Sequence, residues 1–138
     1  MIIGDTGFWL ALANARDAHH VRAQRALDRL TEPLITTWPV LTETCHLLAT
    51  RLEPEAAERF LRAGRQGGFE LFDLDRSQLV RVEVLMEKYR SLPMDLADAS
   101  LVLLAESLGH GRILSTDERD FTTYRWKRHE PFQNLLIP

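Results

Sequence analysis

Short, continuous apolar runs that alternate with helical patterns constrain the fold of this chain more than any other feature. Five runs read as strands: residues 1–5, 34–36, 69–73, 112–116 and 132–137. Six segments between them read as helices: residues 8–14, 18–31, 39–51, 54–65, 76–90 and 95–108. Continuous apolar strands separated by helices are typical of parallel sheets that are covered on both faces. The pattern therefore predicts a three-layer α/β sandwich with a mostly parallel central sheet.

The length and composition suit one globular domain. The chain has 138 residues, which is enough for one hydrophobic core, so we expect a single domain over residues 1–138. The longest apolar run, residues 101–105, is too short to cross a bilayer. The N-terminus lacks the basic region and apolar stretch of a signal peptide, so we expect a cytoplasmic protein without a membrane partner. The single cysteine, Cys45, excludes an internal disulfide and a cysteine-based zinc cluster.

Four carboxylates lie beside or inside segments that are otherwise apolar. Asp5 and Asp117 directly follow or close apolar strands, and the carboxyl ends of parallel strands frame the functional crevice of such sheets. Glu43 and Asp98 fall inside predicted helices with aliphatic neighbouring turns. Buried carboxylates are costly unless positive charge compensates them. We expect no lysine or arginine in their immediate surroundings, so the pattern favours a bound divalent cation.

Capping is the structural alternative for some of these acids. Asp5 and Asp117 can each cap a following helix, since aspartate is favoured at that position. Asp95 is best explained as the N-cap of the helix at 95–108. Glu43 shares its face with aliphatic residues, and Asp98 shares its face with Leu101 and others, so capping explains these two less well.

Carboxylates on separate elements suit hard cations. Mg²⁺ and Mn²⁺ prefer carboxylate and water oxygens, and they can activate a water for phosphodiester hydrolysis. The chain has no P-loop, GxGxxG or HExxH motif and no plausible Ser-His-Asp or Cys-His set. These absences favour metal-dependent hydrolysis over nucleophilic catalysis by a side chain.

The charge balance neither requires nor excludes nucleic acid as a ligand. The net charge is −3, but cations bound to an acidic cluster would cancel part of it. Arginines recur at helical spacing within residues 22–29 and 59–65, and residues 125–129 form a basic cluster that includes a tryptophan. Such clusters can contact phosphates and stack on bases, although solvated helix faces explain them as well.

Four blocks of sequence resemble PIN-domain proteins, and the VapC-type toxins of toxin–antitoxin pairs above all. The blocks are Ile2-Ile3-Gly4-Asp5-Thr6, Thr42-Glu43, Asp98-Ala99-Ser100-Leu101-Val102 and the run from Ile113 to Phe121. Each block alone is weak, but their order and spacing are specific and extend over almost the whole chain. Gly7 departs from the pattern, because many relatives carry serine there.

The resemblance implies an Mg²⁺- or Mn²⁺-dependent endoribonuclease with RNA as its substrate. Its catalytic and metal-binding acids would be Asp5, Glu43, Asp98 and Asp117, with Asp120 as an additional ligand or outer acid. Thr6 and Thr116 would orient carboxylates through their hydroxyls. The resemblance also implies a homodimer and a small cognate antitoxin that covers the acidic crevice.

Three other functions stay open at this point. The same fold could serve a housekeeping nuclease that processes RNA or DNA without an antitoxin. A non-catalytic nucleic-acid-binding module is a second alternative. A phosphotransfer domain with Asp5 as nucleophile is a poor third, because Gly7 stands where one such class needs a second aspartate.

Overall fold

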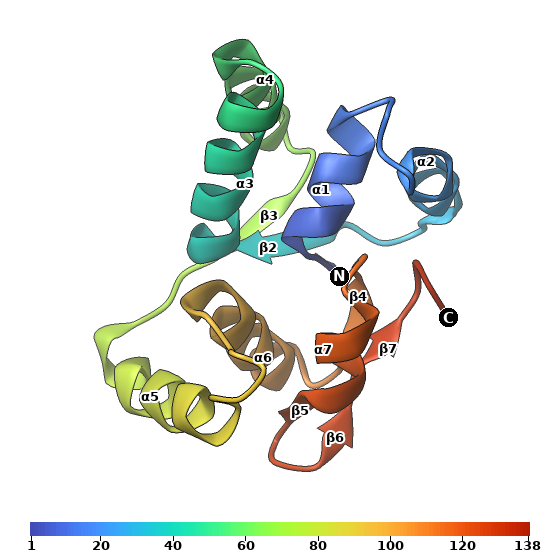
Figure 1. Ribbon diagram of the computed structural model, residues 1–138. Helices are drawn as coiled ribbons and strands as arrows, with labels where there is room; N and C mark the ends of the chain where they lie inside the picture. Colours follow the sequence, from blue (N-terminus) through green and yellow to red (C-terminus); the bar gives the residue numbers. More distant parts are fainter.

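The computed structural model describes residues 1–138, and its centre is a five-stranded, wholly parallel sheet (Figure 1). The strands lie in the order β3-β2-β1-β4-β7. Their bounds are β1 (Ile2–Gly4), β2 (Leu34–Thr37), β3 (Glu70–Phe72), β4 (Arg112–Leu114) and β7 (Gln133–Asn134). A separate antiparallel pair consists of β5 (Arg125–Trp126) and β6 (Glu130–Pro131).

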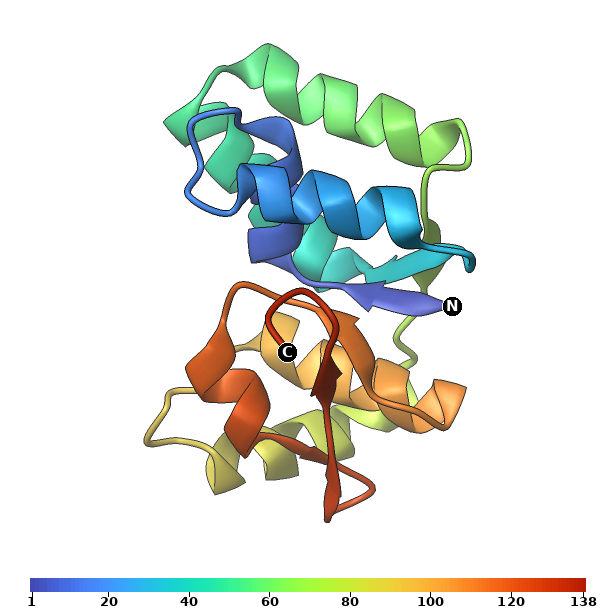
Figure 2. The ribbon, with the colours of Figure 1, turned by 90° about the vertical axis from the view of Figure 1, so that its right-hand side faces the viewer.

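Helices cover both faces of the sheet. They are α1 (Thr6–Ala13), α2 (His20–Arg29), α3 (Trp38–Arg51), α4 (Pro54–Arg65), the 3-10 helix η1 (Arg76–Gln78), α5 (Leu79–Lys88), α6 (Leu96–Leu108) and α7 (Glu118–Thr123). Figure 2 shows α1 to α4 above the sheet and α5, α6 and α7 below it. The predicted three-layer α/β sandwich is therefore confirmed. No helix combines the length and apolar character needed to cross a membrane.

The apolar runs form the core as their patterns predict. All of β1 is buried, and so are Ile113 and Leu114 of β4. Helix α6 is buried on nearly all sides, with Asp95 as its N-cap and Gly109 in the left-handed conformation (φ 78°) as its C-cap. The predicted capping role of Asp95 is confirmed.

Local differences from the expected elements have physical causes. The first helix begins at Thr6 rather than residue 8, because Asp5 already caps it. The strand expected at 132–137 pairs with β4 only at Gln133–Asn134. The hairpin of β5 and β6 is absent from the prediction, since Lys127 and Arg128 adopt positive φ angles in its turn without the glycine or asparagine that usually indicates one.

Two neighbouring strands end at the edge of the sheet where Asp5 lies. β1 and β4 are adjacent and parallel, so they end at the same edge of the sheet. The Asp5 N–H donates to the Leu114 carbonyl at 3.1 Å. This bond extends the ladder by one residue and holds Asp5 beside the segment that follows β4.

Candidate metal centre

A cleft of about 380 Å³ opens at this carboxyl edge, and only three of its 16 lining residues are hydrophobic. All of the acids expected from the sequence line it: Asp5, Glu43, Asp98, Asp117 and Asp120. They come from the end of β1, from α3, from the first turn of α6 and from the start of α7. The fold thus brings to one cleft carboxylates that are up to 115 residues apart in the sequence.

Asp5 is the most buried of the acids that surround the cleft, together with Asp120. Its side chain is the N-cap of α1, where Oδ1 accepts the Thr6 N–H at 2.7 Å, and Oδ2 accepts the Ser115 hydroxyl at 2.8 Å. Burial raises the pKa of Asp5 to about 6, although these two hydrogen bonds act in the opposite direction. Asp5 therefore caps a helix and also lines the cleft, so the capping explanation does not compete with a metal-binding one.

Asp117 lies next to Asp5 through a shared hydroxyl. The Ser115 hydroxyl, which donates to Asp5, also accepts the Asp117 N–H at 2.9 Å. Asp117 caps α7 by accepting the Asp120 N–H at 3.0 Å. Burial raises the pKa of Asp117 above its ordinary value. The sequence did not single out Ser115, because only the strand register decides which hydroxyl of the Ser115-Thr116 pair faces Asp5.

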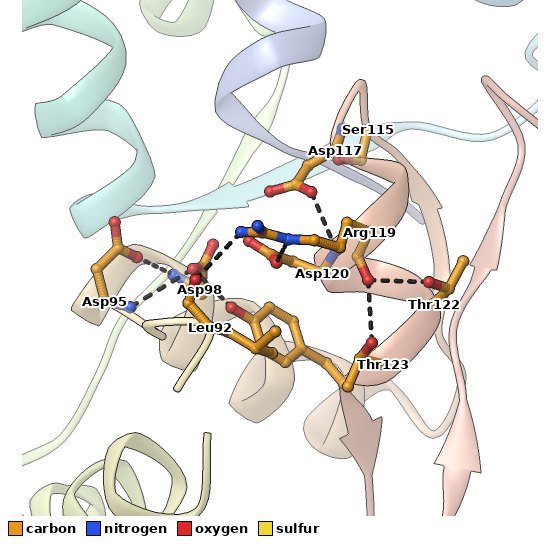
Figure 3. Close-up of polar contacts among 10 residues, drawn as sticks. Leu92, Asp95, Asp98, Ser115, Asp117, Arg119, Asp120, Thr122 and Thr123 are labelled. Carbon is orange, nitrogen blue, oxygen red and sulfur yellow. Dashed lines mark hydrogen bonds and ion pairs between the residues drawn. The ribbon is translucent and has the colours of Figure 1, made fainter. Parts of the chain in front are cut away.

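Asp98 occupies the opposite wall (Figure 3). Its carboxylate accepts the Tyr124 hydroxyl at 3.0 Å, and its own N–H donates to Asp95 at 2.8 Å. Burial and the negative charges of Asp95 and Asp5 raise the pKa of Asp98 to about 8. The pKa of the Tyr124 phenol is also raised, by burial and by the Asp98 charge. The ionised form of Asp98 is therefore unfavourable at this position unless a cation lies near it.

Glu43 projects into the cleft from the middle of α3. It is half-buried, and burial together with the charge of Asp95 raises its pKa. The buried Thr6 hydroxyl lies beside the Glu43 carboxylate and acts against the rise of its pKa. Thr6 therefore lies where it can orient Glu43, the role that the resemblance implies for its hydroxyl.

The expectation that no basic residue compensates these acids is wrong. Arg51, at the end of α3, and Arg119, in α7, also line the cleft. Figure 3 shows the Arg119 side chain reaching from α7 towards the start of α6. Sequence reasoning missed Arg51, although its spacing of eight residues from Glu43 puts both on one face of the helix. Arg119 stands two residues after Asp117 and directly before Asp120, so the sequence did contain a signal for it.

The lack of a side chain at Gly7 is explained by its close approach to Thr116 at the same edge of the sheet. A Cβ atom at this position would lie 1.9 Å from the Thr116 hydroxyl oxygen. Thr116 therefore fills the space that a side chain at residue 7 would need. The Thr116 hydroxyl thus lies directly beside residue 7, and Thr116 itself lines the cleft.

The donors present fit a hard divalent cation in kind. They are almost entirely carboxylate and hydroxyl oxygens, which Mg²⁺ and Mn²⁺ prefer, and the raised carboxylate pKa values are those that a cation would lower again. No three acidic, histidine or cysteine side chains stand close enough together to form a finished coordination shell as placed. Side-chain rotations and metal-bound water would have to complete it.

The fold and the cleft together define an α/β domain with an acidic centre at the carboxyl edge of its sheet. The family model of the PIN domain matches residues 2–127, and the chain belongs to that family. Ribonuclease VapC26 of Mycobacterium tuberculosis (strain ATCC 25618 / H37Rv) is 30% identical over 125 residues, which are 91% of this chain and 92% of that protein.

A solved structure supports the fold. It is the crystal structure of Mycobacterium tuberculosis VapC20, described as a Sarcin-Ricin loop cleaving toxin. The TM-score is 0.78 at 24% identity, with 86% of this chain and 92% of that chain covered. The resemblance to VapC-type PIN proteins that the sequence blocks indicate is confirmed.

Proposed function

We propose that this chain is a metal-dependent endoribonuclease that hydrolyses RNA phosphodiester bonds and acts as the toxin of a toxin–antitoxin pair. Membership of the PIN-domain family and the similarity to a VapC ribonuclease support the activity. The observation that carries the site assignment is the convergence of five carboxylates in one cleft. Residues 1–138 would form a single nuclease domain around it.

Some of the cleft residues would bind the metal ion, and others would orient these ligands. Asp5, Glu43, Asp98 and Asp117 would hold Mg²⁺ or Mn²⁺ and are the proposed catalytic acids. Asp120 would be an outer acid of the same set. Two hydroxyls fix the orientation of the ligands: Ser115 contacts both Asp5 and Asp117, and Tyr124 donates to Asp98. Partners of this kind orient metal ligands and tune their basicity.

The chemistry follows from this arrangement. When bound, the divalent cation supplies an activated water and stabilises the charge on the phosphate oxygens. Asp5 and Asp98 both line the cleft, from the end of β1 and the first turn of α6, and together would hold the cation against which the RNA phosphate binds. Burial keeps their carboxylates out of bulk water, which strengthens their interaction with a bound cation.

The partners proposed for the protein are the RNA substrate, a small cognate antitoxin and a second copy of the chain. The antitoxin would cover the acidic cleft and so exclude both metal and RNA. Growth arrest on expression, relieved by co-expression of a short open reading frame from immediately upstream, would support the toxin role. RNA cleavage without growth arrest would favour the housekeeping nuclease instead.

The decisive experiment is cleavage of total cellular RNA by the purified protein with Mn²⁺ or with EDTA, followed by mapping of the RNA ends. Asp5→Asn removes a ligand charge while keeping the side chain's shape. A ligand contribution of several kcal/mol corresponds to a loss of cleavage on the order of 1000-fold. Asp28→Asn, an exposed acid on α2, is the matched control and should cleave like the wild type. Undiminished cleavage by Asp5→Asn would sink the assignment.

A further inference from the structure

Arg119 is anchored at the mouth of the acidic cleft by two hydrogen bonds. Its Nε–H donates to Asp120 Oδ1 at 3.0 Å, and Nη2 donates to the Leu92 carbonyl at 3.1 Å, in the loop before α6 (Figure 3). Asp120 is buried, whereas the Arg119 side chain is 72% exposed. A buried acid thus holds an exposed cation across the cleft, between α7 and the start of α6.

The anchored guanidinium keeps unused donors. A guanidinium has five N–H donors in a rigid planar fork, which matches the oxygens of a phosphate. Arg119 uses one donor for Asp120 and one for Leu92, and the others have no acceptor in the protein. Because the head group is fixed at two points, little conformational entropy remains to be lost when a ligand binds.

Stability alone does not explain this contact. The Arg119 end of this ion pair is exposed to solvent, which limits its contribution to folding although Asp120 is buried. The loop that Arg119 reaches is already held by backbone bonds, since the N–H groups of Leu92 and Met94 donate to the Tyr89 carbonyl at 3.2 and 3.1 Å. The cleft, in contrast, needs positive charge, because a polyanionic strand must approach a surface that is rich in carboxylates.

We propose that Arg119 binds a phosphate group of the RNA strand at the mouth of the cleft, and that Asp120 positions its guanidinium for this contact. The inference rests on the proposed function, since it names how the same cleft recognises its substrate. Arg119 touches the substrate, whereas Asp120 acts through Arg119. A phosphate contact of this kind positions the strand without reading its sequence.

The test measures RNA binding in the absence of cleavage. The Asp5→Asn protein, with Mn²⁺ present, is titrated into a fluorescent single-stranded RNA oligonucleotide at several salt concentrations. Adding Arg119→Ala should weaken binding about tenfold, the effect of one charged hydrogen-bonded contact. It should also reduce the slope of log affinity against log salt by about 0.7, the value for one phosphate on a single strand.

Three further variants separate phosphate binding from a purely structural role. Arg119→Lys keeps the charge, so it should keep most of the salt slope while losing part of the affinity. The RNA affinity of Asp120→Asn should fall between those of the proteins with Arg119 and with Arg119→Ala, because the guanidinium remains but is no longer held by Asp120. Arg125→Ala is the matched control: Arg125 lies in β5, directly after α7, its Nη1 donates to the carbonyls of Thr122, Thr123 and Tyr124, and it is not among the residues that line the cleft. Its salt slope should not change.

Each outcome decides the proposal. Unaltered affinity and slope in Arg119→Ala would overturn it. If Arg119→Ala lowers the melting temperature well beyond Arg125→Ala while the salt dependence of RNA binding is unchanged, the contacts of Arg119 stabilise the fold and do not bind phosphate. Loss of binding to a protein partner without loss of RNA binding would also overturn it. If Arg119→Ala weakens RNA binding as expected but the wild type cleaves no RNA, the nuclease assignment fails while the phosphate site stands.

Discussion

The two edges of the central sheet hold acidic side chains in opposite electrostatic states. At the amino edge, Glu32 pairs with Arg112 and with the N-terminal ammonium of Met1. These partners lower the pKa of Glu32 to about 2, chiefly through the Arg112 hydrogen bond. The pair joins the segment before β2 to the first residue of β4. The charge here is neutralised within the chain.

At the carboxyl edge, burial dominates instead. The pKa of Asp5 rises to about 6 and those of Glu43, Asp98 and Asp117 rise as well. Their hydrogen-bond partners are mainly hydroxyls and backbone N–H groups, which orient a carboxylate without neutralising it. Strongly perturbed acids in a cleft are characteristic of functional sites. The acid at the amino edge is thus neutralised by an ion pair that stabilises the fold. The acids at the carboxyl edge are not fully neutralised within the chain, so they can bind a cation.

The largest expected effect is a pH dependence of stability in the metal-free protein. A carboxyl whose pKa is raised by folding binds its proton more tightly in the folded state, so the free energy of unfolding falls as pH rises from its unfolded pKa through its folded pKa. For Asp5 this window lies between 3.8 and about 6. At about 1.4 kcal/mol for each pKa unit, Asp5 alone corresponds to a loss of roughly 3 kcal/mol. Urea unfolding from pH 4 to pH 8 in EDTA measures it.

The control for this experiment is the cation itself. Excess Mn²⁺ should offset the decline between pH 3.8 and about 6, since ligand at 100 times its dissociation constant stabilises the folded state by about 2.7 kcal/mol. The effect of Glu32 on the free energy of unfolding has the opposite sign. Its stabilising contribution is present above its ordinary pKa of 4.5 and is lost as the pH falls towards 2. It therefore adds no slope near neutrality. A flat stability profile in EDTA would contradict the contrast between the two edges.

A smaller effect is expected from Ser115→Ala. This change removes the hydroxyl that donates to Asp5 at 2.8 Å and accepts the Asp117 N–H at 2.9 Å. Outer partners of metal ligands are typically worth about 10- to 100-fold in metal affinity or activity. Calorimetric titration with Mn²⁺ and the kcat/KM for RNA cleavage measure the two consequences.

Ser77→Ala is the matched control for Ser115→Ala. The Ser77 hydroxyl also donates to a carboxylate, Asp75 Oδ2 at 2.6 Å, but it lies in η1 and is exposed. It should leave cation affinity unchanged. Equal behaviour of the two variants would mean that the hydroxyl at the strand end does not organise the cleft.

The acids of the cleft were easier to predict from the sequence than the groups that surround them. Asp5 and Asp117 stand out because an apolar strand ends on each, and parallel strands end at a common edge. Glu43 and Asp98 stand out because a carboxylate on an apolar helix face needs an explanation. These are local signals, and the family match supports the fold that they indicate.

The surrounding groups depend on tertiary geometry that local patterns do not contain. The Ser115 hydroxyl contacts Asp5 across 110 residues of chain, and Arg119 reaches Leu92 across 27 residues. The basic cluster at 125–129 looked suited to phosphate contacts. In the structure it forms the β5–β6 hairpin, where Arg125 is occupied by backbone carbonyls.

The smallest expected effect comes from the amino edge. Glu32→Gln removes the charge that pairs with Arg112 and the N-terminal ammonium. Because the pair is only half-buried, the loss of stability should be slight, a lowering of the melting temperature by a few degrees at most. Cation affinity and RNA cleavage should stay at wild-type levels, because the edge where Glu32 lies is the one away from the cleft. If Glu32→Gln weakened Mn²⁺ binding as much as Ser115→Ala, the two edges would be coupled, and their separation into a stabilising edge and a binding edge would be wrong.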